Sequence, residues 1–292
     1  MTSTKPLDRD PLSPLRRELL SLLRCPEDQG LLFGWDSLSP EGVLSCSDCG
    51  RTYPIRNGVP CLLPDGLRET SSLDASRAVE FSEKQSEMAA RDAQSGDYDR
   101  MLGLKLLTLR ELPLSLRYLS PQSGSVVLEG GCGTGRMTEM FARNSRLLIA
   151  MDFSAESIQA ARRKLPTDLH DRVLFIQADL SRLPLQTEAF DRVGSFGVYQ
   201  HLPTPEARDR AMGEMARTVK TAADGGRFAY SAYRWGAPIN LFSQREGHHP
   251  GGIYYYRFTG AEFREQAAPR FDVKSHSESL MYYHILSAEK KS

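Results

Sequence analysis

From about residue 119 onward, apolar runs alternate with amphipathic stretches, and this alternation restricts the fold more than any other feature of the chain. The apolar runs are SVVLEG, RLLIAMD, RVLFIQAD, FDRVGSFG, GGRFAYSAY, RFDVKSHS and LMYYHILSAE, in that order. Segments with a helical pattern separate them, namely RMTEMFARN, SAESIQAARRKL, PEARDRAMGEMARTVK and GAEFREQAAP. Such an alternation is typical of an α/β fold in which helices cover a mostly parallel sheet. We therefore predict a doubly wound, seven-stranded sheet.

Composition and charge argue against several classes of protein. The 292 residues include 37 lysines and arginines and 37 aspartates and glutamates, so the net charge gives no overall attraction to a large polyanion. No apolar run approaches the ~20 residues of a membrane span, and the N-terminal segment is too charged and too rich in proline for a secretory signal. Five cysteines, an odd number, do not suggest a disulfide framework. We expect a soluble, cytoplasmic protein with no membrane partner, whose oligomeric state the sequence does not reveal.

The segment VVLEGGCGTGRM, residues 126–137, places glycines where the first strand of this region turns into its helix. Glycines at this point of a parallel sheet let a ligand approach the backbone closely. A dinucleotide site requires Gly-x-Gly-x-x-Gly or Gly-x-Gly-x-x-Ala, but Arg136 stands where the third small residue belongs. The pattern that does fit is an acid followed by alternate glycines: Glu129, Gly131, Gly133 and Gly135.

This pattern resembles motif I of the class I S-adenosylmethionine-dependent methyltransferases, and the resemblance extends from about residue 119 to the C-terminus. It implies a Rossmann-like fold with S-adenosylmethionine as the cofactor. The acid that ends the next strand, Asp152, would accept hydrogen bonds from both ribose hydroxyls. Asp179 would accept a hydrogen bond from the adenine amino group, and the backbone N–H of Leu180 would donate to the ring. The resemblance also places Cys132, Phe153, Phe196 and Gly197 against the cofactor, with Cys132 as a small filler of the loop and not a nucleophile.

The polar and helical segment before the sheet resembles the cap of this family. In SGDYDRML, Tyr98 and Arg100 stand where relatives cover the methionine end of the cofactor. Arg100 or Arg91 would pair with the cofactor carboxylate. The alternative is that these side chains belong to an exposed helical face.

Methyl transfer from a sulfonium is an in-line displacement with a neutral leaving group, so the protein mainly aligns the acceptor and excludes water. A general base is useful only if the acceptor carries a proton of high pKa. His201, in VYQHLP after the fourth strand, is the best candidate for that base, although a histidine there also shapes the loop. Its neighbour Tyr199 would line the acceptor pocket or lie in the core.

The segment after the fifth strand, YSAYRWGAPINLFSQREGHHPGGIYYYRF, is rich in aromatic residues and histidines. Such a segment suits a flat or partly apolar acceptor, although the tyrosine run also reads as a strand with alternating exposure. The predicted function is methyl transfer to an O, N or C atom of a small organic acceptor. The alternatives are an RNA methyltransferase of the rRNA guanine type and a non-catalytic activator subunit.

Four of the five cysteines lie in the first 66 residues, in LLRCPEDQGLL and LSCSDCGRTYPIRNGVPCLLPD. These segments resemble the zinc ribbon of the tRNA-methyltransferase activator family and the ribbon that precedes some bacterial rRNA guanine methyltransferases. The implied metal ligands are Cys25, Asp28, Cys46 and Cys49, with aspartate where a second thiolate is expected. Three cysteines and one aspartate form a chemically reasonable zinc site. The alternative is a ribbon without metal that packing holds together, with Cys61 as a buried apolar residue.

These observations predict three segments. Residues 1–66 form a ribbon-like domain, residues 67–118 a helical linker or cap, and residues 119–292 the methyltransferase domain. In the RNA alternative, the ribbon grips the RNA.

Overall fold

The computed structural model describes residues 12–35, 39–68, 75–94, 102–238, 244–249, 251–279 and 282–291. Two residues predicted to cover the cofactor, Tyr98 and Arg100, lie outside these ranges. The boundaries predicted for the three segments stay predictions.

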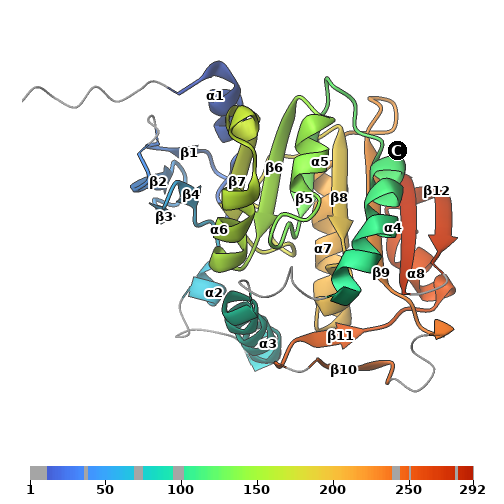
Figure 1. Ribbon diagram of the computed structural model, residues 1–292. Coiled ribbons are helices and arrows are strands. Elements are labelled where there is room, and N and C mark those ends of the chain that lie inside the picture. The colour runs from blue at the N-terminus through green and yellow to red at the C-terminus, as the bar shows by residue number, and fades with distance from the viewer. Residues whose placement is uncertain are drawn as a thin grey trace, which may run out of the picture.

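The main body is a seven-stranded sheet with the strand order β12-β13-β9-β8-β5-β6-β7 (Figure 1). Strands β7, β6, β5, β8 and β9 pair in parallel, while β13 runs antiparallel to both β9 and β12. Each of the seven predicted apolar runs forms one of these strands, so the α/β prediction is confirmed. The strands are β5 (Val126–Gly130), β6 (Leu147–Asp152), β7 (Val173–Gln177), β8 (Arg192–Phe196), β9 (Arg227–Tyr233), β12 (Phe271–Glu278) and β13 (Tyr283–Lys290).

Helices cover both faces of the sheet, which explains why every residue of β5, β6, β7 and β8 is buried. On one face the core joins the sheet to α4, α5 and α6, and on the other face it joins the sheet to α7 and α8. The helices are α4 (Leu102–Leu119), α5 (Thr138–Arg143), α6 (Ala155–Lys164), α7 (Pro205–Thr218) and α8 (Gly260–Ala267). Ser154 begins α6, because its hydroxyl accepts a hydrogen bond from the backbone N–H of Ser157 at 3.1 Å.

The strand order places β5 between β6 and β8, and the chain crosses from one face to the other at this point. In open α/β sheets a crevice forms where the order reverses, beyond the carboxyl ends of the strands. Helix α3 (Ala75–Gln94) and the antiparallel pair of β10 (Glu246–His248) and β11 (Tyr254–Tyr256) lie beyond this end of the sheet (Figure 1). The fold therefore closes the crevice with segments from before and after the central strands.

The N-terminal ribbon is an antiparallel sheet of β1 (Leu32–Phe33), β2 (Gly42–Cys46), β3 (Thr52–Arg56) and β4 (Val59–Pro60). It lies against the edge strand β7 and follows the short helix α1 (Pro14–Ser21). The backbone N–H of Leu62 donates to the carbonyl of Gln177 at 2.7 Å, and that of Arg24 donates to the carbonyl of Pro184 at 2.8 Å. The ribbon thus covers an edge that would otherwise expose unpaired backbone groups.

Between the ribbon and α3 lies the short helix α2 (Asp65–Arg68). No helix in the described part of the chain is long and apolar enough to cross a bilayer.

Candidate functional site

The glycine-rich turn after β5 adopts a backbone that other residues rarely accept. Gly131, Gly133 and Gly135 have φ values of 79°, 53° and 83°, in the left-handed region that favours glycine. A Cβ on Gly131 would lie 2.3 Å from Cγ2 of Val198, and a Cβ on Gly135 would lie 2.9 Å from Cα of Ala161. A Cβ on Gly133 would meet nothing within 4 Å. Two of the glycines therefore allow tight packing, and the third faces open space.

Two adjoining cavities lie at the carboxyl ends of β5, β6, β7 and β8. The first follows the glycine turn, and the second runs toward the loop after β7. They share Glu87, Gly131, Asp152, Phe153, Val198 and His201. The first also contains the predicted residues Glu129, Cys132, Gly133, Phe196 and Gly197, and the second contains Asp179 and Leu180. Of the predicted cofactor residues in the described ranges, Gly135 alone is outside both linings, where it shapes the turn.

Asp152 ends β6 and joins the glycine turn to the strand. Its carboxylate accepts hydrogen bonds from the backbone N–H of Gly133 at 2.8 Å and of Ser154 at 2.9 Å. Burial raises the pKa of Asp152, and the two backbone donors partly offset this. A carboxylate has about four acceptor positions, so Asp152 keeps acceptor capacity toward the cavities.

Two more carboxyl groups line the same cavities. Glu129 accepts a hydrogen bond from Oγ1 of Thr138 at 2.7 Å, and burial raises its pKa to about 8. Glu87 comes from α3 and pairs with Arg91 at 3.1 Å, and burial raises its pKa to about 7. Glu87 is not predictable as a site residue from the sequence, because its only signal is a charged position in a helical pattern.

The raised pKa of Glu129 makes the stability of the ligand-free protein depend on pH. The ordinary value is 4.5, so between pH 4.5 and about 8 the unfolded chain releases a proton that the folded chain retains. Stability is therefore fully present below pH 4.5 and is lost as the pH rises toward 8. We expect Glu129→Gln to be about 1–3 kcal/mol more stable than the wild type at pH 8 and equal to it near pH 4, as measured by urea unfolding.

Glu139→Gln is the matched control for that measurement, because Glu139 lies on the exposed side of α5 in a surface pair with Arg143. Its stability should follow the wild-type pH profile. If Glu129→Gln also followed the wild-type profile, the assignment of a buried, protonated Glu129 would be wrong.

Two arginines reach the first cavity from opposite sides. Arg91 lies on α3 beside Glu87, and Arg136 pairs with Glu111 of α4 at 2.6 Å. The other oxygen of Glu111 accepts from the hydroxyl of Ser231 at 3.0 Å. Positive charge therefore lies beside the carboxyl groups at this end of the site.

Asp179 lies in the loop after β7 and is buried against α3. Its carboxylate accepts from the ammonium group of Lys84 at 2.7 Å and from the backbone N–H of Ser181 at 3.0 Å. Burial opposes the ionisation of Asp179, but Lys84 and Ser181 outweigh that effect and lower its pKa. Lys84, which like Glu87 lies on α3, is likewise not predictable as a site residue from the sequence.

His201 lines both cavities, but both of its ring nitrogens are hydrogen-bonded within the protein. Nδ1 lies 2.7 Å from the carbonyl of Tyr254, so Nδ1 carries the proton, and Nε2 accepts from Nε2 of Gln200 at 3.1 Å. Burial lowers the pKa of His201 well below its ordinary value. The neutral ring thereby ties β11 to the short helix η3 (Tyr199–His201).

Of the two positions predicted for Tyr199, the acceptor pocket and the core, the structure shows the core. Its side chain is fully buried and outside both cavity linings. Its hydroxyl donates to the carbonyl of Arg208, and its ring packs edge-on against Tyr230 at 5.3 Å. The turn of η3 directs this side chain into the core, and the local sequence does not reveal that direction.

Aromatic rings from the segment after β9 gather next to His201. The ring centroid of Tyr233 lies 5.5 Å from that of His201, and the ring of His249 lies 6.1 Å from it. Tyr255 packs against His249 at 4.6 Å. Nε2 of His249 is buried and has no hydrogen-bond partner within the described ranges. These rings therefore pack next to His201, outside the linings of both cavities.

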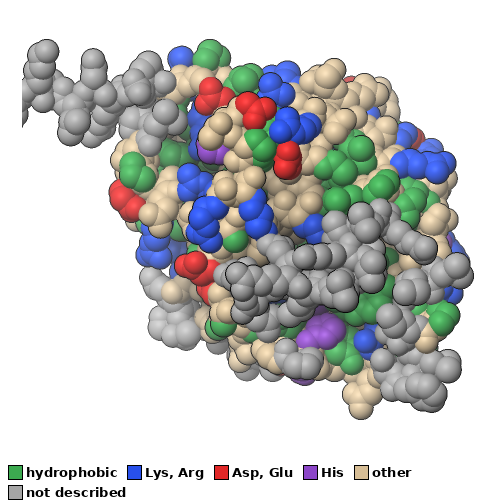
Figure 2. All heavy atoms as spheres, in the orientation of Figure 1, with side chains coloured by type: hydrophobic (Ala, Val, Ile, Leu, Met, Phe, Trp, Pro, Cys, Tyr) green, Lys and Arg blue, Asp and Glu red, His purple; other side chains and the backbone are tan. Residues whose placement is uncertain are grey.

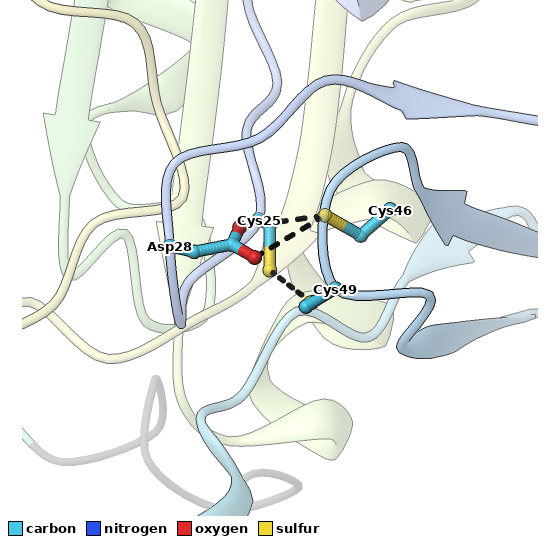
Figure 3. A group of neighbouring side chains, drawn as sticks. All are labelled: Cys25, Asp28, Cys46 and Cys49. Atoms are coloured by element: carbon cyan, nitrogen blue, oxygen red, sulfur yellow. Dashed lines mark hydrogen bonds between the residues drawn. The ribbon is translucent and has the colours of Figure 1, made fainter.

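The ribbon brings together the four predicted metal ligands, Cys25, Asp28, Cys46 and Cys49 (Figure 3). Their ligand atoms all lie within 4.8 Å of one another. The sulfur atoms of Cys25 and Cys49 are 3.8 Å apart, and Sγ of Cys46 lies 3.3 Å from an oxygen of Asp28. A tetrahedral zinc ion with ~2.3 Å bonds to sulfur needs ligand separations of about 3.5–3.8 Å. The residues present therefore fit zinc, which would cross-link the two turns of the ribbon.

Backbone groups support the same arrangement. The N–H of Glu27 points to Sγ of Cys25, and that of Asp48 points to Sγ of Cys46, each at 3.4 Å. Cys61 is not part of the group, and its thiol lies 3.6 Å from the carbonyl of Val59.

Metal analysis of protein purified without chelator should find about one zinc ion per chain. We expect Cys46→Ser to lose the metal and Asp28→Cys to bind it about tenfold or more tightly, because a fourth thiolate replaces a harder oxygen ligand. Competition with a chromogenic chelator measures the affinity. Cys61→Ser is the matched control and should keep the metal. Wild-type protein that contains no zinc when purified without chelator, and that unfolds at the same temperature as Cys46→Ser, would contradict the assignment.

Comparison with known proteins matches two parts of the chain to two families. The family described as a methyltransferase domain matches residues 127–222, and the family described as Trm112p-like protein matches residues 16–58. A demethylmenaquinone methyltransferase of Clavibacter sepedonicus is 31% identical over 153 residues, which cover 51% of this chain and 59% of the relative. Among the first curated relatives, the matched share of the relative ranges from 37% to 59%, so the chain spans about half their length.

Two solved structures share the fold. One is a complex between the Trm112 methyltransferase activator of Haloferax volcanii and a methyltransferase, with a TM-score of 0.57, 18% identity and coverage of 69% of this chain and 98% of that chain. The other is a Burkholderia thailandensis 1,6-didemethyltoxoflavin-N1-methyltransferase with bound S-adenosylhomocysteine, with a TM-score of 0.57, 21% identity and coverage of 75% and 94%. Together with the glycine turn, the strand order and the cysteine group, these matches show that the chain contains an S-adenosylmethionine-dependent methyltransferase domain, matched over residues 127–222, and an N-terminal Trm112p-like domain, matched over residues 16–58.

Proposed function

We propose that this protein transfers the methyl group of S-adenosylmethionine to an O, N or C atom of a small organic acceptor. The observation that carries the proposal is the pair of adjoining cavities, which gathers the glycine turn, Asp152 and Asp179 at the ends of consecutive strands. When bound, the cofactor supplies a methyl carbon on a sulfonium. The acceptor atom would bond to this carbon in line with the breaking carbon–sulfur bond, and the neutral thioether would leave.

The residues of the two cavities suit the parts of this cofactor. Asp152, between the cavities, would accept from the ribose hydroxyls. The second cavity, which includes Met151 and Leu180, would hold the adenine ring, with Asp179 at its amino group. The first cavity would hold the methionine portion, with its ammonium group near Glu129 and its carboxylate near an arginine.

The carboxyl groups also favour the positive charge of the sulfonium, which S-adenosylmethionine carries and its product S-adenosylhomocysteine lacks. Glu87, Glu129 and Asp152 all line the first cavity, and although burial raises the pKa of Glu129 and keeps it protonated in the ligand-free protein, a bound cation would favour its ionised form. Negative charge in a buried site stabilises a nearby cation more strongly than it does in water. A sulfonium would therefore bind better than the neutral thioether that remains after transfer, which helps product release.

A small, flat acceptor would suit an extension of the site past His201 toward Tyr233, His249 and Tyr255, which lie beside His201 but outside both cavity linings. Two similar proteins are named as methyltransferases of demethylmenaquinone and of 1,6-didemethyltoxoflavin. For His201, burial and two internal hydrogen bonds favour a positioning role over the role of general base.

The Trm112p-like domain would serve this same chain as a built-in counterpart of a separate activator. The Haloferax structure is named as a complex of an activator with a methyltransferase. Here the ribbon and the sheet share one chain, and the ribbon hydrogen-bonds to the edge strand β7. In this role the ribbon would act on the methyltransferase domain and would not bind the acceptor.

RNA is the second candidate acceptor, and one observation favours it. Lys and Arg side chains gather over α6 and the adjoining ribbon (Figure 2). The last turn of α6 carries Arg162, Arg163 and Lys164, and the guanidinium of Arg162 donates to the carbonyl of Asn57 in the ribbon. Phosphate contacts from such a cluster would make binding strongly dependent on salt.

Calorimetry with S-adenosylhomocysteine, followed by a methyl-transfer screen with radiolabelled S-adenosylmethionine, tests the proposal. The screen compares quinones, phenols, heteroaromatic amines and rRNA fragments. We expect binding heat, turnover of at least one small compound and none of RNA. Labelling of RNA alone would establish the second candidate, and the absence of cofactor binding would overturn both.

A further inference from the structure

A buried row of alternating charges connects α3 to the adenine end of the site. Lys84 of α3 donates from Nζ to Asp179 at 2.7 Å, to Oγ of Ser181 at 2.8 Å, and pairs with Glu80 at 2.8 Å. The second oxygen of Glu80 pairs with Arg210 of α7. Lys84, Asp179 and Glu80 are each about 95% buried. The row therefore links α3, α7 and the loop after β7 through groups that water barely reaches.

Lys84 lines the second cavity but has no donor left for a ligand. An ammonium group has three N–H bonds, and Asp179, Ser181 and Glu80 accept all three. Its influence on a bound nucleoside must therefore pass through the carboxylate of Asp179.

We propose that Lys84 is a positioning residue that keeps Asp179 ionised. The charged carboxylate of Asp179 would then accept a hydrogen bond from the amino group of adenine. The inference rests on the proposed function and extends it, because it places part of the recognition of the 6-aminopurine on α3. A buried carboxyl group without a neighbouring cation takes up a proton. A protonated Asp179 would be a weaker acceptor, since hydrogen bonds to ionised groups are about twice as strong as neutral ones.

Two ligands that differ at one position isolate this contact. S-adenosylhomocysteine carries an amino group at C6, and its analogue with unsubstituted purine carries hydrogen there and retains N1. For the wild type we expect the amino compound to bind about 10–100-fold more tightly. For Lys84→Gln, which keeps a donor beside Asp179 but removes the charge, this ratio should fall below about threefold at pH 7.

The pH dependence of the ratio separates this role from a merely structural one. In Lys84→Gln the ratio should recover as the pH rises and Asp179 ionises, whereas in the wild type it should stay constant from pH 6 to 9. The other titratable or charged groups near Asp179 and its cavity are Glu80 and Glu87 of α3, Arg210 of α7, His201 of η3 and Asp152 after β6. Both ligands carry the same ribose and homocysteine, so the titration of these groups cancels in the ratio.

Isothermal calorimetry on the full chain provides the measurement, and two further variants complete it. In Asp179→Asn the ratio should already be low, and adding Lys84→Gln should leave it unchanged. Lys220→Gln, which removes a lysine–aspartate pair with Asp191 away from both cavities, should keep the wild-type ratio. Should Lys84→Gln fail to fold, the double variant Lys84→Gln/Asp179→Asn replaces it, because Glu80 stays paired with Arg210. The ratio of the double variant is then compared with that of Asp179→Asn alone.

An unchanged ratio in Lys84→Gln across pH 6–9, or a further fall when Lys84→Gln is added to Asp179→Asn, would overturn the inference. Wild-type protein that bound neither ligand would instead overturn the proposed function, so the two failures are distinguishable.

Discussion

Replacing Asp152 by alanine is expected to lower the affinity for S-adenosylhomocysteine by about 100-fold or more, because two charge-assisted hydrogen bonds to the ribose would be lost. The side chain also accepts the N–H groups of Gly133 and Ser154, so its loss releases the glycine turn from the end of β6. The lost hydrogen bonds and the released glycine turn both weaken the binding of S-adenosylhomocysteine. Isothermal calorimetry on the purified full chain measures the affinity.

Asp168→Ala is the matched control for this change, because Asp168 is exposed in the short helix η2 (Thr167–Arg172). It should bind the ligand as the wild type does. An Asp152→Ala protein that melts at the wild-type temperature and binds with wild-type affinity would refute the assignment of the cofactor site.

Replacing Gly135 by alanine is expected to destabilise the folded protein by about 2–4 kcal/mol. The added methyl group would lie 2.9 Å from both Cα and Cβ of Ala161, and the backbone of α6 cannot move without disturbing the core. The positive φ of 83° adds conformational strain. Urea unfolding measures the loss, and calorimetry at a temperature where the variant remains folded should show weakened binding.

Gly133→Ala separates the steric contact with α6 from the strain of a positive φ. Gly133 also has a positive φ, but its added Cβ would meet nothing within 4 Å. We expect it to lose only about 1 kcal/mol of stability, while binding weakens because the methyl group enters the cavity that Gly133 lines. Equal stability losses for the two alanine variants would show that contact with α6 does not explain the glycine at position 135.

Much of the site follows from local sequence. The alternation of apolar and amphipathic segments predicts the order of strands and helices, because burial on both faces requires continuous apolar runs in the central strands. Glu129, Asp152 and Asp179 each lie at or just beyond the end of such a run, and parallel strands bring these ends to one edge. The spacing of Cys25, Asp28, Cys46 and Cys49 likewise predicts their convergence, since two short turns carry all four.

The contribution of α3 could not be predicted in this way. Glu80, Lys84, Glu87 and Arg91 follow one another at intervals of four, three and four residues, so they share one face of the helix. A charged helical face usually points to water. Here that face packs over the cavities, and the buried charges are tolerated because each has an opposite charge beside it.

Tyr199 and His201 show the same limit at the level of single side chains. They lie two residues apart in η3, yet one ring enters the core and the other reaches the cavities. Only the packing of β11 and α7 around this turn selects the two directions, through the carbonyls of Tyr254 and Arg208.

By itself, the sequence determined the order of the elements, the glycine turn with its acids and the four ligands of the ribbon, because each is encoded by spacing within a short stretch of chain. The tertiary structure alone decided which charged groups lie beside Asp179 and the second cavity, that the neutral His201 hydrogen-bonds to Tyr254 and Gln200, and that the ribbon covers β7. These features depend on contacts between segments far apart in the chain, where the free energy of burying a charge is settled by the partner that the fold brings to it.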